Sequence, residues 1–176
     1  RLTIGMATFD DYDGVYFSVQ ALRMYHREVM ADAEIIVIDN KPDSKASPML
    51  RSLMNHVPNG RSIPMVEPQG TTAPRQRIFD EARGETVLCM DSHVLIQPYA
   101  IESLLRYTDP YHPWSKNLFS GPMVYDNHVS IATHFDDIWR GQMWGIWGEA
   151  FATTDANQPP FTILQDKEGN CSFHKL

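Results

Sequence analysis

Short apolar runs divide the first half of the chain at regular intervals. Residues 2–7, LTIGMA, form the first run, and residues 34–39, EIIVID, form a continuous run rich in β-branched side chains. Such uninterrupted runs are typical of parallel strands that are buried on both faces. Residues 62–67, SIPMVE, are a poorer run, in which Pro64 predicts an irregular or edge strand. Together with residues 86–90, TVLCM, the pattern predicts four strands.

Helical periodicity fills the intervals between and after these strands. Val15, Val19 and Leu22 recur at the spacing of one helix face. Ser47 is the expected N-cap of the next helix, with Pro48 in its first turn. The predicted helices are residues 12–27, 47–57, 71–84 and 98–107. Strands and helices that alternate in this order predict an α/β domain with a mostly parallel sheet.

The character of the sequence changes near residue 108, where prolines, histidines and aromatic residues replace the clear periodicity. The segments LFSGPMVYD and HVSIATHF predict a pair of strands around Asn127. Residues 136–151, DDIWRGQMWGIWGEAF, contain three of the four tryptophans. We interpret residues 1–107 and 108–176 as two halves of a single domain, because the second half is too irregular to fold alone.

Charge and composition exclude several classes of partner. Acidic residues outnumber basic ones by 22 to 15, for a net charge of −7, so no basic stripe is present to neutralise a nucleic-acid polymer. A mononucleotide ligand remains compatible with this charge. No apolar run approaches the length of a membrane span, and no signal-peptide pattern is present. Cys89 and Cys171 lie far apart and suggest no disulfide, so we expect a reducing, cytoplasmic location.

Acidic residues follow three of the four predicted strands. Residues 8–11, TFDD, follow the first strand, residues 39–40, DN, the second, and residues 91–93, DSH, the fourth. Ligands of open parallel sheets bind outside the carboxyl ends of the strands, so these residues are the candidate site. The chain has no G-x-G-x-x-G sequence and no Walker-type loop, which argues against dinucleotide oxidoreductases and P-loop enzymes.

The triplet Asp91-Ser92-His93 places a carboxylate and an imidazole at one strand end. This pair of donors suits Mn²⁺ or a similar ion better than Mg²⁺ or Ca²⁺ alone, which prefer all-oxygen shells. A cation there can bridge a diphosphate and stabilise its charge as it leaves. The alternative is structural: Asp91 caps the following turn and His93 is an ordinary hydrogen-bonded residue.

The segment GTTAPRQRIFDEARGETVLCMDSH, residues 70–93, resembles the donor-site region of GT-A glycosyltransferases, and of glycosyltransferase family 2 in particular. The opening LTIGMATFDD…ALRMYH…EIIVIDN is similar to the family's first β-α-β unit. The resemblance covers residues 2–107 and implies a Rossmann-like GT-A fold, an open, mostly parallel sheet flanked by helices. His93 replaces the second acid of the family's Asp-x-Asp motif. A similar Asp-Ser-His occurs in polypeptide N-acetylgalactosaminyltransferases, which share the fold and use Mn²⁺.

The resemblance also implies roles for individual donor-site residues. Thr8, Phe9 and Asp10 would line the nucleoside pocket, with Phe9 against the base. Asp39 would contact the base or ribose, and Arg75 would approach the base or diphosphate, aided by the positive end of its helix. Each residue has a structural alternative. Asp10 could cap the helix that starts near residue 12, and Asp39 could form an Asx-turn. Phe9 could belong to the core, and Arg75 could be a solvated helix residue.

The metal would be Mn²⁺ or Mg²⁺, held by Asp91 and His93, and through it the site would hold the diphosphate of the donor. The expected donor is a UDP-sugar. The acceptor, a carbohydrate or another molecule, would meet the second half of the chain. Aromatic residues there could stack on sugar rings or could fill a thin core; they are Tyr125, His134, Trp139, Trp144 and Trp147.

An inverting transferase needs a carboxylate base beside the acceptor hydroxyl. The candidates are Asp136, Asp137 and Glu149, with Asp137 and Glu149 as our choice. The family's late acidic motif has no clear copy before Leu176, and the family's domains usually run longer. We therefore expect a domain that is truncated at its C-terminus, and the base could lie beyond residue 176.

These features predict a metal-dependent, inverting glycosyltransferase that uses a nucleotide-sugar donor. One alternative is a nucleotidyltransferase, but such enzymes usually carry a glycine-rich loop with a basic residue after the first strand. The segment ATFDDYDG, residues 7–14, lacks that loop. A second alternative is a non-catalytic module that binds a nucleotide-sugar, which the missing base would favour.

Overall fold

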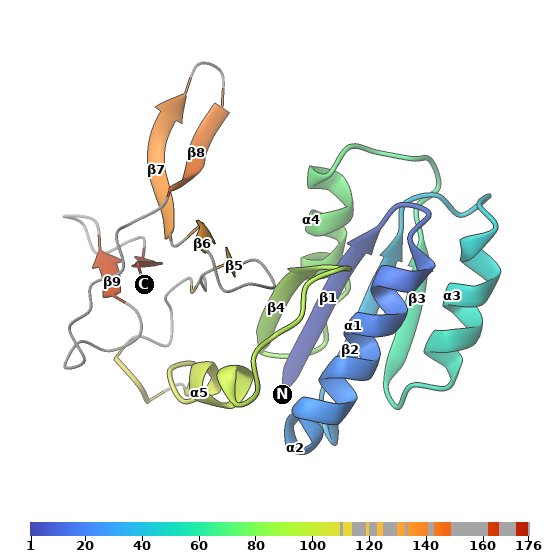
Figure 1. The fold of residues 1–176 in the computed structure, drawn as a ribbon, viewed down its shortest axis with the longest axis horizontal. Helices are drawn as coiled ribbons and strands as arrows, with labels where there is room; N and C mark the ends of the chain where they lie inside the picture. Colours follow the sequence, from blue (N-terminus) through green and yellow to red (C-terminus); the bar gives the residue numbers. More distant parts are fainter. Residues whose placement is uncertain are drawn as a thin grey trace. The chain divides into compact units, whose positions relative to one another are not determined.

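The computed structural model describes residues 1–109, 111–113 and 119 with their side chains, and the backbone of six strands beyond them. The chain divides into two compact units, Arg1–Arg106 and Tyr107–Leu176 (Figure 1). That both halves form one domain, truncated at its C-terminus, stays a prediction.

The first unit is a four-stranded parallel sheet with helices on both faces (Figure 1). The strand order is β3-β2-β1-β4, and every pairing is parallel. This arrangement confirms the predicted α/β class and all four predicted strands. In chain order the elements are β1 (Leu2–Thr8), α1 (Tyr12–Tyr25), α2 (Arg27–Met30), β2 (Glu34–Asp39), α3 (Ala46–Asn55), β3 (Gly60–Pro64), α4 (Thr72–Glu81), β4 (Thr86–Asp91) and α5 (Ala100–Leu105).

Two layers of apolar side chains hold the helices to the sheet. In Figure 1, α1 and α3 lie in front of the sheet and α4 lies behind it. Val19 of α1 and Leu50 of α3 are fully buried in the larger cluster, and Ile78 of α4 packs with Ile36 and Ile38 in the smaller one. Each fully buried side chain of this size contributes about 1.5–3 kcal/mol. Because helices cover both faces, the four residues between Glu34 and Asp39 of β2 are all apolar instead of alternating with polar ones.

Gly5 allows α4 to pack directly against β1. A Cβ atom at this position would collide with the side chain of Ile78, so only glycine fits under the helix. The helix predicted for residues 71–84 stops at Glu81, and Gly84 passes close to the backbone at the start of β1.

The first predicted helix, residues 12–27, is in fact two helices. His26 leaves the helical region with φ −127° and ψ 41°, so α1 ends at Tyr25 and the short α2 follows. The His26 ring is buried, with Nδ1 3.1 Å from Glu102 Oε2 and Nε2 3.3 Å from the Ile96 carbonyl oxygen. These contacts draw His26 into the interior and explain the break.

The predicted cap of the second helix was wrong by two residues. Lys45 is the N-cap of α3, and its side chain makes no capping hydrogen bond. Ser47 lies inside the first turn, where it is buried and its Oγ accepts a hydrogen bond from Arg51 Nη1 at 2.7 Å.

The second unit contains antiparallel strand pairs. The predicted pair around Asn127 is confirmed as β5 (Met123–Val124) and β6 (Ser130–Ala132). The tryptophan-rich segment forms a ladder that the sequence pattern did not predict, between β7 (His134–Arg140) and β8 (Met143–Gly148), in which Trp139 is opposite Trp144. The third pair is β9 (Thr162–Gln165) and β10 (Ser172–Lys175). Across the part of the chain that the structure describes, no helix is long and apolar enough to span a bilayer.

Candidate functional site

The carboxyl ends of β1, β2 and β4 bring the predicted site residues to one edge of the sheet. Thr8 at the end of β1 is in register with Asp39 of β2. Ala7 is in register with Asp91 of β4 on the other side. The three loops that leave this edge therefore start from neighbouring strands, as expected for a ligand site in an open sheet.

Asp39 is a buried residue whose two carboxylate oxygens differ in their hydrogen bonding. Asp39 is about 1% exposed, and Oδ1 accepts a hydrogen bond from the Lys41 backbone N–H at 3.1 Å, which is the Asx-turn considered as the structural alternative to a ligand contact. Oδ2 is also buried, yet no hydrogen-bond donor contacts it among the described residues. Burying a polar atom without a partner is costly, so Oδ2 is suited to a donor from a ligand.

Asn40 fastens the loop that borders Asp39. Its Nδ2 donates to the Gln69 carbonyl at 2.6 Å, and the Gln69 N–H donates to Asn40 Oδ1 at 2.9 Å. The Met65 N–H donates to the Asp39 carbonyl at 2.9 Å, which fixes the start of the same loop. The loop that starts at Met65 is therefore fastened to the end of β2 at Asp39 and Asn40. The sequence pattern did not predict this role of Asn40, because its partner is 29 residues away.

Phe9 and Asp10 lie at the mouth of the site. Phe9 is 57% exposed, so it does not belong to the core. Lys41 Nζ lies 5.2 Å from the centroid of the Phe9 ring and 3.6 Å from Asp10 Oδ2. The cation thus covers one face of the ring through a cation–π contact. A base stacked on Phe9 would use the other face or displace Lys41.

The helix cap that the sequence analysis considered for Asp10 belongs to Asp11. Asp11 Oδ1 accepts a hydrogen bond from the Gly14 N–H at 2.9 Å, which caps α1. Asp10 has a positive φ of 55° and turns its carboxylate to Lys41 instead. Thr8, predicted to line the pocket, is buried, and its hydroxyl donates to the Asp11 carbonyl at 3.1 Å.

Arg75 and Asp91 form an ion pair at the same edge. Arg75 Nη2 lies 2.6 Å from Asp91 Oδ1, and the two side chains are 45% and 39% exposed. Arg75 comes from the first turns of α4, so this contact ties that helix to the end of β4. The pair presents a cation and a carboxylate to solvent, where both can meet a charged ligand.

The turn after β4 is tied to α1. Ser92 is buried, and its Oγ donates to Asp11 Oδ2 at 3.2 Å. Ser18 Oγ donates to the carbonyl oxygens of Ser92 at 2.8 Å and Val94 at 3.2 Å. His93 is 70% exposed, and its Nδ1 lies 3.6 Å from Asp11 Oδ2. The turn is thus fixed while the imidazole remains open to solvent.

No group of three or more His, Cys, Asp or Glu side chains is arranged for a metal within the described residues. Asp91 and His93 supply two exposed donors of the types that Mn²⁺ accepts, and phosphate oxygens and water can complete its shell. Burial raises the pKa of the nearby Cys89 thiol, which disfavours the thiolate that binds metals.

The predicted catalytic acids fall outside the part of the structure with described side chains. Asp137 belongs to β7, whose register with β8 shifts between Asp136 and Trp139. Glu149 and Tyr125 lie outside the described residues. The choice of Asp137 and Glu149 as the base, and the role of the aromatic residues in acceptor binding, stay predictions.

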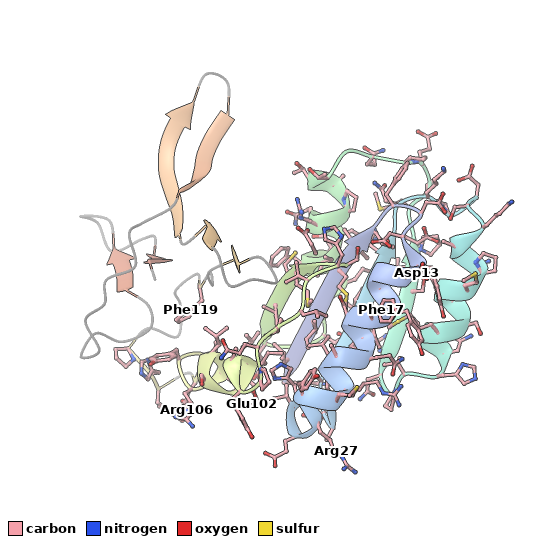
Figure 2. The ribbon with its side chains drawn as sticks, viewed as in Figure 1. Asp13, Phe17, Arg27, Glu102, Arg106 and Phe119 are labelled. Carbon is pink, nitrogen blue, oxygen red and sulfur yellow. The ribbon has the colours of Figure 1, made fainter. Side chains whose placement is uncertain are left out.

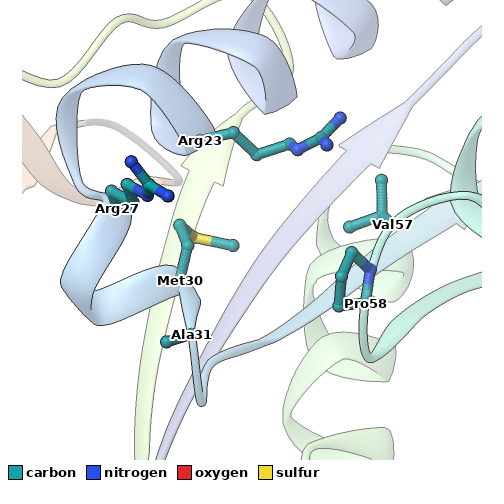
Figure 3. Close-up of a pocket in the computed structure, with 6 residues that line it drawn as sticks. All are labelled: Arg23, Arg27, Met30, Ala31, Val57 and Pro58. Carbon is teal, nitrogen blue, oxygen red and sulfur yellow. The ribbon is translucent and has the colours of Figure 1, made fainter.

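A shallow pocket of about 290 Å³ opens away from this edge, between the end of α1, α2 and the turn before β3 (Figure 3). Its lining consists of Arg23, Arg27, Met30, Ala31, Val57 and Pro58. Ala31 precedes β2 and Pro58 precedes β3, so the pocket lies at the amino ends of these strands. It is therefore separate from the candidate site.

Comparison with known sequences agrees with this geometry. The model of the family described as Glycosyl transferase family 2 matches residues 3–113, more than half of the chain. A protein of Mycosarcoma maydis named dolichol-phosphate mannosyltransferase is 32% identical over 76 residues. The aligned part is 43% of this chain and 26% of that protein, so the chain matches about a quarter of this relative.

Solved structures share the fold. S. aureus TarS 1-349 superposes with a TM-score of 0.54 and 17% identity, over 62% of this chain and 32% of the TarS chain. The same protein in complex with UDP-GlcNAc gives a TM-score of 0.53 and 17% identity, over 62% of this chain and 31% of that chain. Likeness at this identity concerns the fold, and it covers about a third of TarS.

Proposed function

The chain belongs to glycosyltransferase family 2, and on that premise we propose that it is the donor-binding part of an enzyme that transfers a sugar from a nucleoside-diphosphate sugar. The observation that carries the proposal is the buried Asp39 carboxylate, whose Oδ2 has no donor among the described residues. The Arg75–Asp91 ion pair lies at the same sheet edge and offers charge for a diphosphate.

The proposed donor is a UDP-sugar. Uracil presents an N3–H donor that an anionic acceptor such as Asp39 can bind, whereas cytosine presents an unprotonated N3. Phe9 offers an exposed ring face against which a base can stack, and Asp10 and Thr8 lie in the same loop. One solved structure with the same fold is named as a complex with UDP-GlcNAc, which supports this choice of nucleotide.

The reaction requires charge compensation for the departing diphosphate. Arg75 supplies one positive charge, which it shares with Asp91 while no ligand competes. Asp91 and His93 would hold Mn²⁺ or Mg²⁺, and such an ion would offset the negative charge that develops on the leaving group. Asp137 or Glu149 would deprotonate the acceptor hydroxyl in an inverting transfer. We also propose a cytoplasmic location, in keeping with the free Cys89 thiol.

Nucleotide binding tests the proposal directly. Melting temperatures would be measured with UDP, GDP and CDP, each with and without Mn²⁺. At a hundredfold excess over Kd, a ligand stabilises the folded state by about 2.7 kcal/mol. For a chain of this size this corresponds to roughly 5–10 °C. We expect that rise for UDP with Mn²⁺, and no rise with any nucleotide would refute the donor site.

Two further measurements separate the parts of the proposal. Asp91→Ala should abolish the Mn²⁺-dependent part of the rise, while Asp80→Ala, an exposed acid on α4, should leave it unchanged. Release of UDP from a UDP-sugar would distinguish an enzyme from a non-catalytic binding module. Binding without release in the full-length protein would favour the binding module.

A further inference from the structure

Asp11 occupies a position between the start of α1 and the Asp91-Ser92-His93 turn. One carboxylate oxygen, Oδ1, accepts the capping hydrogen bond from the Gly14 N–H at 2.9 Å. The other, Oδ2, accepts from Ser92 Oγ at 3.2 Å and lies 3.6 Å from His93 Nδ1. The carboxylate is therefore fixed from two sides and faces the imidazole with the oxygen that Ser92 holds.

This arrangement matches the requirement of a histidine that binds a metal. Such a histidine commonly donates its second ring N–H to a carboxylate, which fixes the tautomer and the ring orientation. The 3.6 Å separation is an ion-pair distance, longer than a hydrogen bond, and rotation of an exposed ring can shorten it. With Nδ1–H directed at Asp11, the lone pair of Nε2 is free for a cation.

We propose that Asp11 is the positioning residue for His93, directing Nδ1 to itself and leaving Nε2 for the divalent cation. The inference rests on the proposed donor site, in which His93 and Asp91 hold that ion. It also assigns a role to Ser92, which lies between Asp91 and His93 in the sequence: its hydroxyl orients the Asp11 carboxylate. Ser18 fixes the backbone of residues 92–94 through two carbonyl oxygens, so the backbone stays in place while the His93 ring rotates.

The substitution Asp11→Asn separates this role from helix capping. Asparagine caps helices about as well as aspartate, so the bond from Gly14 can persist while the negative charge facing His93 is lost. Asp13→Asn is the matched control, because it removes the same charge from an exposed residue in the first turn of the same helix (Figure 2). Melting temperatures of both variants without ligand would show that each is folded.

The readout is Mn²⁺ affinity, measured from the electron paramagnetic resonance signal of free Mn²⁺ with saturating UDP. We expect Asp11→Asn to weaken Mn²⁺ binding about 10- to 100-fold, the range for lost outer-shell partners. Asp13→Asn should stay within about twofold of the parent protein, since it lies outside the turn. Metal-free UDP affinity should be the same in both variants. In a His93→Ala background Asp11→Asn should have no further effect, because the two residues would act as a unit.

Equal Mn²⁺ affinity in Asp11→Asn and Asp13→Asn would overturn the inference. The inference would also be overturned if Asp11→Asn reduced Mn²⁺ affinity by the same factor in the His93→Ala background, because the loss would then be a general effect of charge. If Asp11→Asn does not fold, Ser92→Ala provides the second route and should weaken Mn²⁺ binding by a smaller factor. Unchanged affinity in that variant would then overturn the inference. A parent protein that binds UDP but no Mn²⁺ would overturn the inference and the metal role of Asp91 and His93 but leave the nucleotide site standing, whereas one that binds no nucleotide would overturn the proposed donor site as a whole.

Discussion

The two ends of the parallel sheet carry similar charged residues and use them differently. At the amino end, Glu34 is buried and fully partnered: it accepts from Thr3 Oγ1 at 2.8 Å, Arg61 Nε at 2.9 Å and the Arg83 N–H at 3.0 Å. At the carboxyl end, Asp39 is equally buried but keeps one oxygen without a donor among the described residues. Glu34 therefore has its acceptors filled by the fold, whereas Asp39 keeps the acceptor that the proposed donor site would use.

Electrostatics at the amino end follow the same logic. Burial raises the pKa of Glu34, but the Arg83 N–H, the Thr3 hydroxyl and the Arg61 guanidinium outweigh it and hold this pKa below its ordinary value. Arg61 also pairs with Glu81 of α4 at 3.3 Å, so the network joins β2, β3 and α4. These charges are committed to one another, whereas Arg75 and His93 at the other end remain exposed.

The largest expected effect comes from breaking the amino-end network. Glu34→Ala should lower the free energy of unfolding by about 3–5 kcal/mol, because it removes the acceptor of the Thr3 hydroxyl and the Arg83 N–H and leaves Arg61 with Glu81 as its remaining carboxylate partner. Urea unfolding of the parent and the variant would measure this loss. Glu28→Ala, at an exposed acid of α2, should change stability by less than about 0.5 kcal/mol. If Glu34→Ala lost as little stability as Glu28→Ala, the contrast between the two ends of the sheet would be contradicted.

Asp39→Asn should have the opposite profile. It should reduce UDP affinity 10- to 100-fold, in line with about 1.5–3 kcal/mol for a hydrogen bond to a charged group. Its effect on unfolding should be below about 1 kcal/mol, since Oδ1 can still accept from Lys41. Calorimetric titration with UDP gives the affinity, with Asp43→Asn, at an exposed acid in the same loop, as the control. Equal losses in both variants would mean that only the net charge matters.

A smaller effect is expected at Asn40. Asn40→Ala removes both side-chain bonds to Gln69, each worth about 1 kcal/mol, and should loosen residues 65–71. We expect faster proteolysis within that loop and a three- to tenfold loss of UDP affinity. Cleavage sites would be mapped by mass spectrometry. Asn55→Ala, at the exposed end of α3, serves as the comparison, and identical cleavage in the two variants would show that Asn40 does not fasten the loop.

The sheet could be predicted because its signal is local. The run from Glu34 to Asp39 has four consecutive apolar residues at its centre, which is typical of a parallel strand covered on both faces, and its predicted bounds are those of β2. Parallel order then fixes which ends of the strands meet, so the carboxyl-edge residues could be grouped before any coordinates. The placement of Asp91 beside β1 follows from the same rule.

The finer features of the site depend on contacts between distant segments or on single dihedral angles. Which of Asp10 and Asp11 caps α1 is decided by the positive φ of Asp10, which the residue type does not reveal. The bonds from Asn40 to Gln69 and from Ser92 to Asp11 join residues 29 and 81 positions apart. Local patterns carry no information about such pairs, so Asn40 and Asp11 could be placed in the candidate site from the sequence, but their partners became visible only in three dimensions.

The absence of a side chain at Gly5 affects the position of Arg75, because both Arg75 and Ile78, which packs on Gly5, belong to α4. Because α4 rests on the bare backbone of β1, even one added methyl group would act as a wedge under Ile78. Arg75 is carried by the same rigid helix and would be displaced with it, stretching its pair with Asp91 although neither residue had changed. A substitution at Gly5 would thus change the position of the Arg75 guanidinium from the middle of the sheet, without altering Arg75 or Asp91 themselves.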